Sequence, residues 1–127
     1  MTPTVPVSWG ELIDKLTILA IKRERLTAEA ARANVRREYE MLAAIAAQVE
    51  ANSKLAELKS ALKTVNEKLW AIEDDIRAKE AAKSFDDDFV RLARAVYHTN
   101  DERGRLKRAI DALLGSEIVE EKEYSAY

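Results

Sequence analysis

Residues that break helices are almost confined to the start of the chain. Both prolines lie before residue 7, and only three glycines occur among the 127 residues. Because nothing after Pro6 interrupts a helix outright, the sequence predicts an all-α fold, an antiparallel bundle of about four helices. We expect a single domain over residues 1–127, with an extended segment at 1–7 and a tail at 116–127.

Capping residues and apolar positions mark the first two helices. Ser8 and Glu11 form a capping box, which predicts a helix reaching about Leu26. This helix is apolar nearly all round, so we expect it to be the most buried one. Thr27 is expected to cap a second helix that reaches about Ala51. Its predicted inward side chains are Val35, Leu42, Ile45 and Val49.

The third and fourth helices follow from the apolar spacing. Over residues 54–82, leucine, isoleucine and valine recur in alternating steps of three and four, which is typical of a coiled-coil seam. We therefore predict that this helix forms a long antiparallel hairpin with the second. A fourth helix is expected from about Asp86 to Leu114, with a bend near Gly104 and its end at Gly115. The acidic run "KSFDDDF" before it is interpreted as a cap rather than a metal site, because successive side chains point apart.

Composition excludes several classes of function. Cysteine is absent and His98 is the only histidine, which argues against thiol chemistry, zinc sites and a serine–histidine triad. The net charge of −2 and the acidic residues that interrupt "IKRER" and "RANVRRE" argue against nucleic-acid binding. No stretch has the apolar length of a membrane span and no secretory signal is present, so we expect a cytoplasmic protein. Neither a cofactor nor a metal is predicted.

Arg103 falls on the inner stripe in both possible registers of the fourth helix. A buried guanidinium needs a carboxylate or an anionic ligand, because burying it unpaired costs several kcal/mol. We expect the third helix to offer the partner of Arg103, with Glu73 as its carboxylate, because Asn66, Trp70, Glu73 and Arg77 form one side strip there. A tryptophan on such a strip indicates that another helix or a ligand covers it.

Polar residues on all four helices are therefore expected to meet inside the bundle. One interpretation is a buried ion-pair network that fixes the register of the helices. The other is a site that clamps a phosphate or carboxylate, with Glu73 or Asp14 as a candidate acid or base. The candidate ligand-binding residues are Lys15, Arg37, Asn66, Trp70, Arg77, Asn100, Arg103 and Lys107, and Lys22 and Glu38 belong to the same constellation.

Five blocks of the sequence carry a resemblance to a family. The blocks "VPVSWGELIDKLTILAIKRERL", "NVRREYEML", "LWAIEDDIR", "VYHTNDERGRLKRAI" and "GSEIVEEKEY" resemble those of an uncharacterised bacterial family, a domain of unknown function. Its members resemble short helical proteins or pieces attached to glycosyltransferase or tetratricopeptide-repeat chains in surface-polysaccharide contexts. The resemblance implies no activity. It does favour a site, and we take a sugar-phosphate or nucleotide-sugar as the expected class of anionic ligand.

Other functions stay open at this point. The seam of the third helix or the tail "EIVEEKEYSAY" is suited to a homodimer or a partner protein, in a module without chemistry. The stretch "ELIDKLTILAIKRERLTAEAA" resembles the opening of all-helical chorismate mutases, although no second block follows. Helical nucleoside-triphosphate pyrophosphatases need E-x-x-E and E-x-x-D pairs to bind magnesium. Glu117 and Glu120 have the spacing of one such pair, but they lie beyond the last predicted helix.

Overall fold

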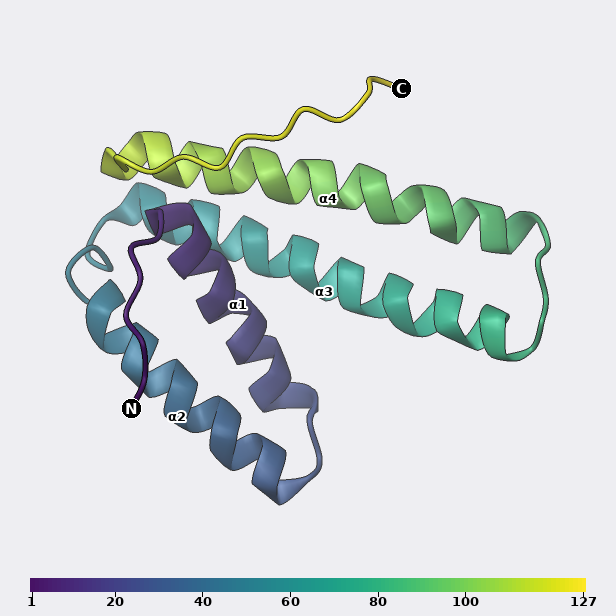
Figure 1. The fold of residues 1–127 in the computed structure, drawn as a ribbon, viewed down its shortest axis with the longest axis horizontal. Coiled ribbons are helices and arrows are strands. Elements are labelled where there is room, and N and C mark those ends of the chain that lie inside the picture. The colour runs from purple at the N-terminus through teal and green to yellow at the C-terminus, as the bar shows by residue number, and fades with distance from the viewer.

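The computed structural model describes residues 1–127 and contains four α-helices and no strand. They are α1 (Trp9–Arg25), α2 (Glu29–Ala46), α3 (Ser53–Ala81) and α4 (Asp87–Leu114). The predicted all-α helical bundle is confirmed. Figure 1 shows α3 and α4 as a long antiparallel pair, with α1 lying across one half of it and α2 packed against α1. The other half of the α3–α4 pair projects beyond the two shorter helices.

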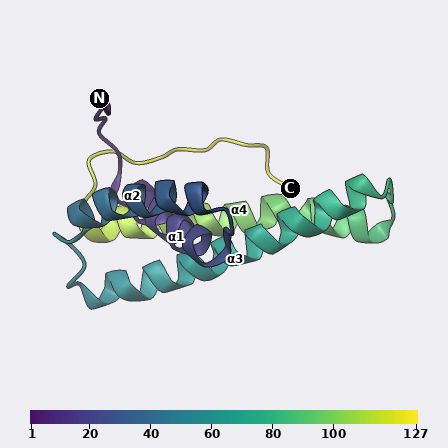
Figure 2. The same ribbon diagram turned by 90° about the horizontal axis from the view of Figure 1, so that it is seen from below.

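Helix α1 is the central element, because it contacts each of the other three helices. Figure 2 shows it between α2 and the α3–α4 pair. This position explains why α1 is apolar on most sides, and it confirms the expectation that α1 is strongly buried. The core that α1 shares with its neighbours consists of Leu12, Ile13, Leu16, Ala46, Leu55, Leu62 and Ile110. None of the helices combines the length and the apolar character that crossing a membrane requires.

The predicted pairing of the second and third helices is wrong. Helix α3 packs along α4, and α2 packs along α1. A seam of apolar residues requires a partner helix, but the residues of the seam do not determine which helix that is. In the structure α3 contacts α4 and α1, and it does not contact α2. Helix α2 also ends at Ala46, well short of the expected Ala51, and Ile45 is 48% exposed where it was predicted to point inward. The buried seam residues of α3 are Leu55, Leu62, Val65 and Ile72.

The capping predictions have mixed outcomes. Ser8 caps α1, its Oγ accepting a hydrogen bond from the Glu11 backbone N at 3.1 Å. The Glu11 carboxylate does not complete the box, since it binds Lys107 instead. Thr27 does not cap α2: the cap position falls on Ala28, which has no side-chain acceptor.

The acidic run before α4 is a helix cap, as predicted. Asp86 Oδ1 accepts from the backbone N of Phe89 at 3.0 Å, while Oδ2 accepts from Lys79 Nζ at 2.9 Å and from Ser84 Oγ at 3.2 Å. The bond from Lys79 and then the backbone bond lower the pKa of Asp86 to about 2. Helix α4 then continues without a break through Gly104 and ends at Gly115, whose φ of 64° is the left-handed conformation common at helix ends. The helix is not interrupted at Gly104, and the predicted bend there stays a prediction.

Candidate functional site

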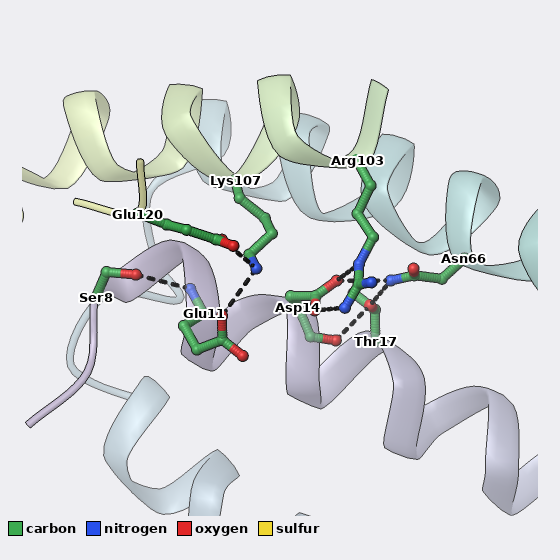
Figure 3. Close-up of polar contacts among 8 residues, drawn as sticks. All are labelled: Ser8, Glu11, Asp14, Thr17, Asn66, Arg103, Lys107 and Glu120. Carbon is green, nitrogen blue, oxygen red and sulfur yellow. Dashed lines mark hydrogen bonds and ion pairs between the residues drawn. The ribbon is translucent and has the colours of Figure 1, made fainter. Parts of the chain in front are cut away.

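A buried polar network joins α1, α3 and α4. Asp14 of α1 is 0% exposed and receives Arg103 of α4 through two bonds, Nε to Oδ1 at 3.0 Å and Nη2 to Oδ2 at 2.5 Å. Asn66 of α3 donates to the same Oδ1 at 2.9 Å and to Thr17 Oγ1 at 2.9 Å. Thr17 in turn donates to the Asp14 carbonyl at 2.7 Å. Figure 3 shows Arg103 and Asn66 converging on Asp14 from two helices.

The charged and polar groups of this network are paired with one another. The bond from Arg103 to Asp14 raises the pKa of the guanidinium, against the opposing effect of burial. No buried side-chain nitrogen or oxygen lacks a hydrogen-bond partner. An anionic ligand would therefore have to compete with Asp14 for Arg103. At these residues the geometry corresponds to an ion-pair network that fixes how three helices meet.

Lys107 forms a second buried centre one turn further along α4. Its Nζ donates to Glu11 Oε2 at 2.8 Å and to Glu120 Oε2 at 2.7 Å. Burial lowers the pKa of Lys107, but the two carboxylates outweigh burial and the net shift is upward. Since Glu120 belongs to the tail, this lysine ties α1, α4 and the tail together, as Figure 3 shows.

The first turn of α1 is bonded to the end of α4. The Gly10 backbone N donates to Asp111 Oδ1 at 2.6 Å, and the Trp9 backbone N donates to Ser116 Oγ at 2.9 Å. These acceptors satisfy backbone donors that a helix start leaves free, and the negative charge of Asp111 suits the positive end of the helix dipole. The approach requires glycine, because a Cβ on Gly10 would lie 2.4 Å from the Lys107 carbonyl oxygen.

We expect the Lys107–Glu120 contact to make the free energy of unfolding decrease at acidic pH. The bond from Lys107 lowers the pKa of Glu120, so the contribution of the contact is present above the ordinary glutamate pKa and is lost as pH falls through the folded value. The Glu120→Gln variant should therefore show a smaller loss of stability between about pH 5 and pH 3 than the unmodified chain. Urea denaturation at a series of pH values measures this. Equal pH dependence in both proteins would contradict it, and Glu123→Gln, on an unpaired tail residue, is the control.

An open groove lies beside the buried network, between α1, α3 and α4. Its volume is about 480 Å³, and one wall holds the half-buried Trp70. At the rim, Arg77 Nε donates to Glu73 Oε2 at 2.9 Å in an exposed pair along one helix. The guanidinium of Arg25 lies 5.6 Å from the centre of the Trp70 ring. The lining includes six of the predicted site residues, Asn66, Trp70, Glu73, Arg77, Asn100 and Arg103.

The remaining predicted site residues lie elsewhere. Lys15 is about half exposed and pairs with Glu38 at 3.8 Å on the α1–α2 side. Arg37 binds Asn34 at 3.3 Å on the exposed face of α2. Neither residue lines the groove: Lys15 faces α2, and α2 itself, with Arg37, packs against α1 alone. Lys107 and Asp14 are in the buried centres rather than in the lining.

Several partners in the two buried centres are not predicted from the sequence. The sequence predicts Glu11 only as part of a cap, and it does not link Thr17, Asp111 or Glu120 to the network. One signal was present, because Glu11, Asp14 and Thr17 are three residues apart and therefore share a face of an otherwise apolar helix. No sequence pattern indicates that Glu120 of the tail binds Lys107.

Comparison with known proteins gives a family but no described relative. No curated protein and no solved structure matches the chain significantly. A family model does match, and it covers residues 3–127, which is almost the whole chain. The chain therefore belongs to DUF6165, a family of unknown function.

Proposed function

We propose that the groove between α1, α3 and α4 binds a small anionic molecule of the sugar-phosphate or nucleotide-sugar class. The observation that carries this proposal is the composition of the groove, which places one tryptophan, two asparagines, two arginines and the two carboxylates of Glu73 and Asp74 from two helices around one space of about 480 Å³. Such a volume falls within the range of known small-molecule sites. An aromatic face, amides and guanidinium groups are suited to a ring, hydroxyls and an anionic group respectively.

The anion would be held at the rim rather than at the buried network. Arg103 is already held by Asp14, whereas Arg77 has a side chain that is 79% exposed and only a pairing with Glu73 along the same helix. Exposed pairs of this kind contribute no more than about 0.5 kcal/mol, so Arg77 is available to a ligand. Arg25 carries a second guanidinium to the same tryptophan and has no carboxylate partner.

Of the two candidate acid–base residues, Glu73 is the better placed. It lines the groove, and about half of its side chain is exposed. Both carboxylate oxygens of Asp14 are occupied by Arg103 and Asn66, and the residue is 0% exposed. We therefore assign Asp14 to holding the helices together and leave any proton transfer in the groove to Glu73.

We expect a ligand of this class to raise the melting temperature of the protein. At about 100 times its Kd, a ligand adds roughly 2.7 kcal/mol, which corresponds to a rise of roughly 10 °C for a chain of this size. The measurement is a thermal-shift series with hexose phosphates, nucleoside diphosphate sugars and neutral sugars. Arg77→Gln and Trp70→Leu should abolish most of the rise.

The control for this series is Arg91→Gln. Arg91 pairs with Asp88 on α4 at 3.5 Å, so this variant also breaks an exposed pair along one helix but leaves the groove intact. It should keep the full ligand response. A rise that survives in Arg77→Gln and Trp70→Leu, or the absence of a rise with every compound, would overturn the proposal.

The proposed setting is the bacterial cytoplasm, in the synthesis of surface polysaccharides. The support is the resemblance of the sequence blocks to a family whose members resemble short helical proteins or pieces attached to glycosyltransferase or tetratricopeptide-repeat chains. The alternative, an interaction or dimerisation module, has less support. The seam of α3 that was to meet a partner is covered by α4 and α1, and the tail runs back along α4 in Figure 1.

A further inference from the structure

A second cavity lies on the other side of α1, where α1 faces α2. It is open to solvent, has a volume of about 440 Å³ and is lined by Ala20 and by four exposed charged residues, Arg23, Glu24, Arg32 and Arg36. Three of these five residues are arginines, two from the start of α2 and one from the end of α1. The cavity shares no lining residue with the groove described above.

None of these three arginines forms an ion pair within the chain. The only carboxylate in the lining is Glu24, and its Oε1 accepts from Lys63 Nζ of α3 at 2.8 Å. The bond from Lys63 lowers the pKa of Glu24, so the carboxylate stays charged and paired with the lysine. In the sequence Glu24 interrupts the basic run, but in the structure Lys63 neutralises it, and the cavity keeps an excess of positive charge.

Two of the guanidinium groups are held in position by contacts that leave most of their donors free. Arg32 Nη1 donates to the Leu26 carbonyl at 2.9 Å, which engages one of its five N–H groups. The guanidinium of Arg23 lies over the ring of Tyr39, 4.6 Å from the ring centre. A stacked guanidinium keeps its N–H groups in its own plane, where they can bind an oxyanion.

We propose that this cavity is a binding site for a phosphate group of a small molecule, with Arg23, Arg32 and Arg36 as its ligands. Arginine binds phosphate through two parallel N–H···O bonds, and three guanidinium groups from two helices match a group with several charged oxygens. The site is independent of the proposed groove, so one can exist without the other.

The experiment is calorimetric titration of the full chain with pyrophosphate and with inorganic phosphate, in a phosphate-free buffer of low ionic strength. We expect saturable binding at one site per chain. Arg32→Gln and Arg36→Gln should each weaken binding about tenfold, since each removes a charge-assisted contact. Lys63→Met should also weaken it, because the released Glu24 carboxylate then competes for the arginines.

Two controls separate this site from overall charge and from the groove. Arg94→Gln removes one exposed positive charge from α4, outside both cavities, and Arg77→Gln alters the groove alone. Both should keep the affinity within about twofold, because exposed charges at a distance are screened. Circular dichroism melting should be unchanged in all arginine variants. The absence of saturable binding, an equal loss in Arg94→Gln, or tighter binding of an oligonucleotide than of pyrophosphate would overturn the proposal.

Discussion

Asp14→Asn is expected to destabilise the protein by about 3–5 kcal/mol, the range for a buried ion pair that loses one partner. The substitution keeps the shape of the side chain but removes its charge. It also turns one acceptor of Arg103 into an amide donor, so that two donors face each other. The loss is a large part of the roughly 5–15 kcal/mol that keeps a domain folded. Urea denaturation followed by circular dichroism measures it.

A surface pair on the same helix is the matched control. Lys15→Met breaks the Lys15–Glu38 pair, which is about half exposed on both sides, and should change stability by less than about 1 kcal/mol. The double variant Asp14→Leu, Arg103→Met replaces the buried pair by apolar side chains and should be more stable than Asp14→Leu alone. If Asp14→Asn loses no more than Lys15→Met does, the network is not what holds α1 against α4.

Gly10→Ala is expected to destabilise the protein by about 3 kcal/mol or more. The added methyl group would lie 2.4 Å from the Lys107 carbonyl oxygen and 2.8 Å from Asp111 Oδ1, and the first of these is a backbone atom that cannot turn aside. Helices α1 and α4 must separate, which strains the core and breaks the bond from Gly10 to Asp111. Thermal and urea denaturation measure the loss.

Gly104→Ala is the control, and it should have the opposite sign. Gly104 lies inside α4, and a Cβ there would meet only Lys122 Nζ, at 3.8 Å. Alanine in an unobstructed helix interior is more stable than glycine by roughly 0.5–1 kcal/mol. Comparing the two variants tests why residue 10 must be glycine: because α1 and α4 approach closely there, rather than because of helix propensity. Destabilisation of similar size at both positions would contradict this.

The expected effect at Asp14 also bears on how ligand binding is tested. A variant of Arg103 that fails to bind a ligand would be uninformative, because removing Arg103 leaves the buried Asp14 carboxylate unpaired. Arg77 and Trp70 are suitable probes because Arg77 is exposed and Trp70 is only half-buried. The same reasoning favours Arg32 and Arg36 for the second cavity.

Much of the local structure could be predicted from residue types. The cap at Ser8, a cap in the run "KSFDDDF", the stop at Gly115 and the inward seam of α3 all depend on neighbours within a few residues, and all are present in the structure. Of the two candidate caps in that run, Ser84 and Asp86, the structure has Asp86. The inner position of Arg103 followed from helical periodicity in the same way. Where a local signal was weak, as at Thr27 and Ala51, the predicted helix ends were wrong.

The sequence by itself determined an all-α chain, the identity of its central helix and the need of Arg103 for a buried partner, because these follow from periodicity, breaking residues and the energetics of burying a charge. Only the tertiary structure decided that α3 pairs with α4, that Asp14 rather than Glu73 receives Arg103, and that Lys63 removes Glu24 from the arginine cluster. The physical reason is that an apolar stripe or a charge requires a partner without specifying it. That choice depends on which helices fill the space around α1.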